Sequence, residues 1–300
     1  MKAITFNALV LALMFGGAVH AAQSIDQTRP VEANARIDVS NIKGSLTVSG
    51  WNKAEMHVTG TLGDGAKGLK IEGDRGHLTI KVEPPDDHGW LSWGADSHMG
   101  NTVLDLKVPH AALLKLETVS ADIAVSGIDA KTLDANTVSG KMRVDSSARQ
   151  VELDSVSGDM DVGGGSDRAH MQTVSGDIRA RGLGGDVSFQ TVSGNIDAEP
   201  NNYHRLDVGT VSGDVTLRGT PAAGAHIGIE TMSGDVHLTL PADVSMHLGA
   251  ETFSGSIRSD FGAVKDQEYG PGSHLDVTTG NGDGQTKVET FSGDIELRRD

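Results

Sequence analysis

The densest group of residues that could do chemistry lies at positions 84–100, in the segment PPDDHGWLSWGADSHMG. Its carboxylates and imidazoles, Asp86, Asp87, His88, Asp96 and His98, are of the types that bind zinc and other divalent ions. Their spacing matches no established zinc pattern, so we interpret them as solvated loop residues. We therefore predict neither a metal site nor a cofactor.

The same segment holds two of the three tryptophans, Trp90 and Trp93. Tryptophan is favoured at binding hot spots, so we name Trp90, Trp93, His88 and His98 as a candidate recognition loop. Two other interpretations stay open for this Gly-, Pro- and Asp-rich loop: it folds back to cover the end or side of the domain, or it is disordered.

Motifs of known enzymes are missing from the sequence. It contains no Gly-x-Ser-x-Gly, no His-Glu-x-x-His and no phosphate-binding loop, and the single Ser-x-x-Lys match, Ser40 to Lys43, lies in a strand-like run. A polysaccharide lyase or hydrolase on a β-helix would leave no local motif, and Arg143, Arg179 and Arg181 with nearby aspartates are its candidate residues. We predict that the chain is not an enzyme and keep this carbohydrate-active class as the alternative.

The elements that must position these residues follow from a tetrapeptide repeat. A sequence of the form Thr-(Val/Met/Phe)-Ser-Gly occurs nine times, with intervals of 18 to 21 residues and a final interval of 38 that we interpret as two periods. A fixed short period indicates units that bury their apolar faces against their neighbours. The copies begin at Thr118, Thr137, Ser155, Thr173, Thr191, Thr210, Thr231, Thr252 and Thr290, and the first ends in Ala121 in place of glycine.

Within one repeat, residues 186–198, two alternating runs meet out of phase at the Thr-Val pair. Val187, Phe189 and Thr191 share one phase, whereas Val192 and Ile196 share the other, which indicates a bend between two short strands. Short strands without helical periodicity predict an all-β, single-domain parallel β-solenoid (β-helix) with coils of about 18–21 residues. An up-and-down barrel or a propeller is the second choice.

Charge alternates at one position of four consecutive repeats, namely Arg143, Asp161, Arg179 and Asp197. If the coils stack in register, opposite charges lie above one another, so we predict that these residues set the register.

The position after the motif glycine instead carries carboxylates in several copies. Repulsion between stacked carboxylates requires either bound cations or hydrogen bonds from backbone N–H groups, and we favour the hydrogen bonds. The stacked Thr and Ser hydroxyls allow an ice-binding surface only if both face outward on a straight strand. The carboxylates concerned are Asp159, Asp177, Asp214, Asp235 and Asp294.

The N-terminus is typical of a secretory signal peptide, with Lys2, an apolar run from Leu9 to Phe15, and small residues before Ala22. We predict a signal peptide at 1–21, an N-terminal tail at 22–30 and one β-solenoid domain at 31–300 with the irregular loop at 84–100. No later segment is long enough to span a membrane. A formal net charge of −16 disfavours nucleic acid and anionic lipid as partners, and with no cysteine the chain forms no disulfide.

These repeats resemble those of the bacterial "putative adhesin" family of unknown function, whose members carry Thr-Val-Ser-Gly-Asp-Ile repeats on an exported parallel β-solenoid. The resemblance covers roughly residues 31–300 and implies no catalytic residues. It rests on the Ser-Gly-Asp copies at Ser157, Ser175, Ser212, Ser233 and Ser292, on Val48 to Trp51, and on the Val108-Pro109 and Leu240-Pro241 junctions.

Together these observations predict an exported, non-enzymatic, adhesin-like structural and interaction module of the bacterial cell envelope, in the periplasm or at the cell surface. Its expected partner is an envelope polymer or protein. Besides the carbohydrate-active enzyme, an envelope-stress sensor or scaffold remains an alternative.

Overall fold

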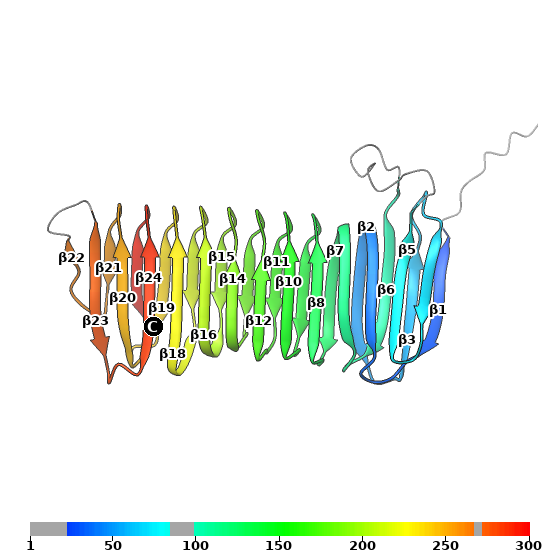
Figure 1. Cartoon of the computed structure of the whole chain (residues 1–300), viewed down its shortest axis with the longest axis horizontal. Coiled ribbons are helices and arrows are strands. Elements are labelled where there is room, and N and C mark those ends of the chain that lie inside the picture. The colour runs from blue at the N-terminus through cyan, green and yellow to red at the C-terminus, as the bar shows by residue number, and fades with distance from the viewer. Residues whose placement is uncertain (1–22, 85–98, 267–271) are drawn as a thin grey trace, which may run out of the picture.

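The structure, a computed structural model of the 300-residue chain, describes residues 23–84, 99–266 and 272–300. Within these ranges the regular structure is all strand and no helix, and the strands stack along one long axis (Figure 1). The predicted signal peptide and the recognition-loop residues His88, Trp90, Trp93 and His98 lie outside the described residues, so both stay predictions.

The middle of the molecule is a regular stack in which each coil contributes two strands. We call the strands before the Thr-x-Ser-Gly corner the leading sheet and those after it the trailing sheet. The leading strands are β8 (Thr132–Thr137), β10 (Gln150–Ser155), β12 (Arg168–Gln172), β14 (Gly185–Gln190), β16 (Asn201–Thr210) and β18 (Thr220–Thr231). The trailing strands are β9 (Met142–Ser146), β11 (Met160–Gly163), β13 (Ile178–Arg181), β15 (Ile196–Glu199), β17 (Val215–Arg218) and β19 (Val236–Leu240).

Neighbouring coils pair in parallel in both sheets. Gln150 pairs with Arg168 in the leading sheet and Met160 with Ile178 in the trailing sheet. Alternate residues point inward, so Val151 and Leu153 meet Met160 and Val162 in a continuous apolar core. The predicted solenoid architecture with mostly parallel strands is therefore confirmed.

The N-terminal end departs from this regularity. It comprises β1 (Ser24–Pro30), β2 (Arg36–Trp51), β3 (Glu55–Thr61), β4 (Gly68–Gly73), β5 (His77–Glu83), β6 (Thr102–Pro109) and β7 (Leu113–Ile128). The long strands β2 and β7 run through the corner, pair in parallel with each other and contribute to both sheets. Beyond β2, however, β3 pairs antiparallel with β1 and β6, and β4 pairs antiparallel with β5.

Within the predicted N-terminal tail at 22–30, residues 24–30 form β1, and Ile25 of β1 pairs with Gly60 of β3. Antiparallel strands need only short connections. The antiparallel strands β1, β3 and β4 can therefore cover the end of the parallel stack without forming another full coil.

The C-terminal end contains β20 (Met246–Thr252), β21 (Ile257–Ser259), β22 (Lys265–Asp266), β23 (Ser273–Thr279), β24 (Gly284–Thr290) and β25 (Ile295–Arg299). The final coil is inserted between two earlier ones. β24 pairs in parallel with β18 on one side and β20 on the other, and β25 lies between β19 and β21. In Figure 1 the red β24 accordingly stands between the yellow β18 and the orange β20.

The insertion shows that the interpretation of the 38-residue interval as two periods was wrong. The chain skips one coil position after β19, forms β20 and β21, turns back through β23, which pairs antiparallel with β20, and then fills the skipped position. Gly280 and Gly282, at φ of 58° and 74°, supply the left-handed conformations of the turn into β24. The charged residues 296–300 therefore belong to β25, which is flanked by a strand on either side, and to the chain end that follows it.

Candidate interaction surface

Each Thr-x-Ser-Gly copy forms the corner between a leading and a trailing strand. In the copy at 137–140, Thr137 and Gly140 are buried while Val138 and Ser139 are exposed, and the Ser139 N–H donates to the Val119 carbonyl of the preceding coil at 2.9 Å. The phase break therefore spans two outward residues. Our assignment of Val192 to the phase of Ile196 was wrong, because Val192 points outward and Ile196 inward.

The motif glycines are required by close backbone approach. A Cβ placed on Gly158 would lie 1.8 Å from the carbonyl oxygen of Gly140, and one on Gly176 would lie 2.0 Å from that of Gly158. No side chain fits at such a separation, so each coil can approach the next only through glycine. The first copy carries Ala121 at this position, and its register partner in β2 is Gly44.

The motif threonines point inward and bond to their own corners. The Thr191 hydroxyl accepts from the Gly194 N–H at 3.0 Å, and the Thr210 hydroxyl accepts from the Gly213 N–H at 3.0 Å. These bonds satisfy backbone donors that the turn would otherwise leave unpaired. Because the threonines are buried, Thr and Ser do not form the shared outward array that an ice-binding surface requires.

The position after the motif glycine forms a ladder of side-chain to backbone hydrogen bonds along the rod, which we call the Asp ladder. The Asp177 N–H donates to Asp159 Oδ1 at 3.3 Å, and the Asn195 N–H donates to Asp177 Oδ1 at 3.0 Å. Through the inserted coil the ladder continues from Asp235 to the Asp294 N–H at 2.8 Å, and from Asp294 to the Ser256 N–H at 2.8 Å. Backbone donors thus offset the repulsion between the carboxylates, as we expected.

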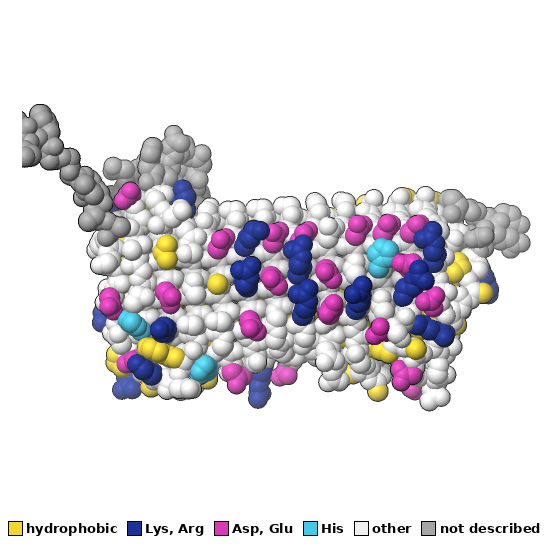
Figure 2. Space-filling view, turned by 180° about the vertical axis from the view of Figure 1, so that it is seen from behind, with side chains coloured by type: hydrophobic (Ala, Val, Ile, Leu, Met, Phe, Trp, Pro, Cys, Tyr) yellow, Lys and Arg dark blue, Asp and Glu magenta, His cyan; other side chains and the backbone are white. Residues whose placement is uncertain are grey.

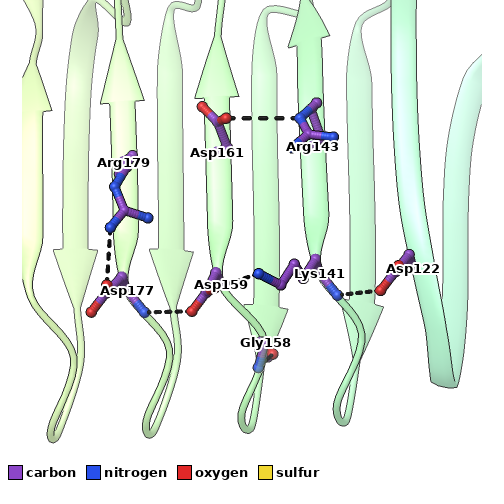
Figure 3. Close-up of polar contacts among 9 residues, drawn as sticks. Asp122, Lys141, Arg143, Gly158, Asp159, Asp161, Asp177 and Arg179 are labelled. Atoms are coloured by element: carbon purple, nitrogen blue, oxygen red, sulfur yellow. Dashed lines mark hydrogen bonds and ion pairs between the residues drawn. The ribbon is translucent and has the colours of Figure 1, made fainter.

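These bonds also shift the protonation equilibria of the carboxylates. The Lys141 ammonium, 3.1 Å from Asp159 Oδ2, lowers the pKa of Asp159, with a further contribution from the Asp177 N–H. The backbone and hydroxyl of Ser256 lower the pKa of Asp294. Lys141 occupies one position of the Asp ladder, and its side chain has no acceptor for a backbone N–H. Its ammonium instead pairs with the Asp159 carboxylate of the next coil (Figure 3).

The four residues predicted to set the register lie side by side on the trailing sheet. Arg143 pairs with Asp161, Asp161 with Arg179, and Arg179 with Asp197. The Arg143 Nε lies 3.8 Å from Asp161 Oδ2, whereas the Arg179 guanidinium turns to Asp177 of its own coil at 3.1 Å (Figure 3). Such alternation appears as dark blue and magenta columns along one long face in Figure 2. Their role in choosing the register stays a prediction.

The residues considered for a carbohydrate-active enzyme share this exposed face. Arg181 Nε lies 4.0 Å from Glu199 Oε2, and Arg143 and Arg179 have their own carboxylate partners. Each guanidinium is thus matched to a neighbouring carboxylate along the rod. Across the ranges that the structure describes, no three His, Asp or Glu side chains are grouped closely enough to hold a metal ion.

The variable residue of the motif forms a continuous row of exposed apolar side chains along the corner, which we call the apolar ridge. Its members are 43–59% exposed, and successive members are joined by the Ser N–H to carbonyl bonds. Large apolar side chains in one contiguous exposed row are typical of interaction surfaces. In spatial order the ridge comprises Val138, Val156, Val174, Val192, Val211, Met232, Phe291 and Phe253.

Sequence reasoning missed the ridge. The signal was present, since the second motif position is always apolar, but we had given Val192 the same phase as Ile196. The apolar side chains point outward because two consecutive residues of each corner, the apolar residue and the serine after it, are exposed.

Comparison with protein families gives one match over nearly the whole chain. The family model described as Toastrack DUF4097 matches residues 21–221 and 201–298. The chain belongs to the Toastrack family. The predicted membership of an adhesin-type family of unknown function is thereby confirmed.

Solved structures similar to this Toastrack chain include a putative adhesin from Bacteroides fragilis, at 10% identity, with 92% of this chain and 98% of that one covered and a TM-score of 0.45. Another is a putative adhesin from Parabacteroides distasonis, at 20% identity, with 72% and 97% covered and a TM-score of 0.42. A third is a putative lipid binding protein from Parabacteroides distasonis, at 8% identity, with 91% and 96% covered and a TM-score of 0.27. The comparison with curated proteins finds no match.

In the described part of this Toastrack chain, no helix has the length and apolar character needed to cross a membrane.

Proposed function

We propose that the chain is an exported, non-enzymatic, adhesin-like structural and interaction module of the bacterial envelope, and that the apolar ridge is its contact surface. The observation that carries this proposal is the ridge itself: eight apolar side chains exposed in register on a rigid stack. Each offers a small contact, and a row held at the strand spacing of about 4.8 Å lets many weak contacts act together.

The family membership and the predicted signal peptide at 1–21 support a place in the envelope, in the periplasm or at the cell surface. A polymer or protein partner suits a long uniform surface better than a small molecule does, because small-molecule sites are concave and few per protein.

The test is retention of isolated cell-envelope fractions by the immobilised mature chain, residues 22–300. A variant with Val174→Ser, Val192→Ser, Phe253→Ser and Phe291→Ser removes half of the ridge without touching the core. A matched control, Arg143→Ser with Arg181→Ser, alters exposed residues on the trailing face. We expect the ridge variant to lose most of the retained material and the control to keep it.

Equal retention by wild type and ridge variant would contradict the proposal. Release of unsaturated sugar products from envelope polysaccharide would instead establish the carbohydrate-active alternative.

A further inference from the structure

The apolar ridge changes character along the rod. Five valines are followed by Met232, Phe291 and Phe253, and the two phenylalanine rings stack at 4.9 Å between centroids with 9° between their planes. We call these three residues the wide end of the ridge. They come from the coils around the insertion, so the inserted coil brings the two rings together.

A groove runs beside the wide end. It has a volume of 640 Å³ and is lined by Thr210, Val211, Glu230, Met232 and Phe291 among others. The floor of the groove is open at Gly209. The neighbouring coils carry the long side chains of Gln190 and Glu230 at this register position, whereas Gly209 has none. A Cβ on Gly209 would meet nothing within 4 Å, so this glycine leaves space rather than permitting close packing.

The wall next to the wide end is acidic. Glu230 pairs in register with Glu289, and Glu289 with Glu251, which places three carboxylates on successive strands. Lys287 Nζ lies 2.7 Å from Glu289 Oε1, and the pKa of Lys287 is raised mainly by Glu289, with further contributions from the charges of Glu230 and Glu251. Beyond Glu251, His274 follows on β23 and Lys265 on β22. With His274 neutral, three carboxylates face the two ammonium groups of Lys287 and Lys265, so the wall keeps a net negative charge.

The opposite flank of the wide end is also acidic, because Asp235 and Asp294 of the Asp ladder lie beyond the corner. In the middle of the ridge the leading flank is neutral beside Val174 and Val192, which follow Gln172 and Gln190 in their motifs. Asp154 holds the same register position one coil earlier. The same apolar ridge thus has an acidic setting at one end and a neutral leading flank in the middle.

We propose that the wide end of the ridge binds a polypeptide segment that carries Lys or Arg beside apolar side chains. The apolar side chains pack on Met232, Phe291 and the groove at Gly209, while the cations lie against Glu230 and over the exposed phenylalanine faces. This proposal rests on the proposed function and names the chemistry of its partner. Anionic polymers and anionic lipid surfaces are repelled by the two acidic flanks.

The test uses the mature chain and two labelled 14-residue helical peptides of Leu with Lys and of Leu with Glu, which have the same apolar pattern and opposite charge. Fluorescence anisotropy measures both at 20 and 200 mM salt. We expect the Lys peptide to bind, to weaken as salt is added, and to bind at least about tenfold more tightly than the Glu peptide at low salt.

Three variants locate the site. Glu230→Gln with Glu251→Gln is expected to weaken the Lys peptide about tenfold at low salt. Gly209→Gln introduces the side chain that its register neighbour Gln190 carries, and its Cβ would meet nothing within 4 Å. This variant fills the groove and is expected to weaken binding of the Lys peptide severalfold. The matched control, Glu117→Gln with Glu152→Gln, removes the same amount of charge from exposed positions of β7 and β10, outside the ridge and the groove, and is expected to leave the affinity within about twofold.

Equal binding of both peptides, or binding unaffected by the glutamate and Gly209 variants, would overturn the proposal. Concentration-dependent dimers that disappear in Phe253→Ser with Phe291→Ser would also overturn it, because the occupant would be a second copy. If envelope retention depends on the ridge but the Lys peptide does not bind, the proposed function stands and only this partner chemistry fails.

Discussion

The middle of the stack and its C-terminal end use the same corner in two different chain orders. In the middle, Gly176 lies against Gly158 of the preceding coil, and chain order equals spatial order. At the C-terminal end, Gly293 lies against Gly234 and Gly255 lies against Gly293, with Cβ-to-oxygen separations of 2.2 and 2.0 Å that match those of the middle. The hydrogen bonds of the Asp ladder also continue through the inserted coil.

The comparison shows that a coil needs a complementary neighbour but not a covalent connection to it. Corner, ladder and core contacts are all made between adjacent coils, so the stability of the stack is approximately a sum of nearest-neighbour terms. The four predictions below test where this equivalence of the two regions holds.

The largest effect is expected from removing residues 284–300. The deletion takes β24 and β25 from between their neighbours and removes the buried side chains of Val288, Ile295 and Leu297. We expect a loss on the order of 5 kcal/mol from the free energy of unfolding of the C-terminal end, measured by urea denaturation. Added 284–300 peptide should restore part of it.

A peptide of the same residues with Ile295→Asp serves as the control and should not restore stability. If the intact peptide has no effect either, the inserted coil depends on its chain connection and the comparison fails.

The next effect contrasts two glycines of one region. Gly176→Ala places a Cβ 2.0 Å from a backbone oxygen, so we expect a loss of about 2–4 kcal/mol as the two coils separate. Gly209→Ala meets nothing, and we expect a gain of up to about 1 kcal/mol from reduced freedom of the unfolded chain. Thermal unfolding of both variants decides the matter, and similar losses would refute the close-approach argument.

A smaller effect is expected at two buried threonines. Thr191→Val leaves the Gly194 N–H without its acceptor and should cost about 1–2 kcal/mol. The Thr231 hydroxyl makes no hydrogen bond in the structure, so Thr231→Val should cost nothing or stabilise slightly. Equal losses in chemical denaturation would mean that side-chain shape, not the corner hydrogen bond, explains the threonine.

The smallest effect concerns pH. The pKa of Asp294 is lowered in the folded state by its bonds from Ser256, so its charge stabilises the fold above the ordinary aspartate pKa of 3.8. That contribution is lost as the pH falls through the lower folded-state pKa. Asp294→Asn keeps an acceptor, as Asn195 does naturally. We therefore expect a deficit of a few tenths of a kcal/mol at pH 7, because Asp294 is largely solvated, and a smaller deficit near pH 3.

Asp154 provides the opposite sign, because burial raises its pKa and the charged form is disfavoured in the folded state. Asp154→Asn should be neutral or slightly stabilising at pH 7. Urea unfolding at both pH values tests the pair, and the same pH dependence in both variants would contradict these assignments.

Much of the fold was predictable because the repeat is local. The spacing of the motif, the inward phase of Val187 and Phe189, and the alternating charges at Arg143 and Asp161 all follow from contacts between adjacent coils. The position of the last coil was not predictable from the sequence. Its motif glycine, Gly293, makes the same close backbone contact as every other motif glycine, so the motif does not specify which coil it stacks on. Its place is decided by β23, whose antiparallel pairing leaves no local pattern.

The candidate surface was less predictable than the fold. An apolar residue such as Val192 next to a buried threonine has the composition of a core residue, and its outward direction depends on the width of the corner. The wide end depends on the insertion as well, because Phe253 and Phe291 are 38 positions apart in the sequence and neighbours only in space.

The insertion also bears on how fast each part assembles. Hydrogen bonds of the Asp ladder join residues 18 apart in the middle and 59 apart at the inserted coil. Closing the longer loop costs about 1 kcal/mol more entropy, and none of it is recovered until the returning segment has docked. We therefore expect the central coils to form first and the paired phenylalanines to come together last.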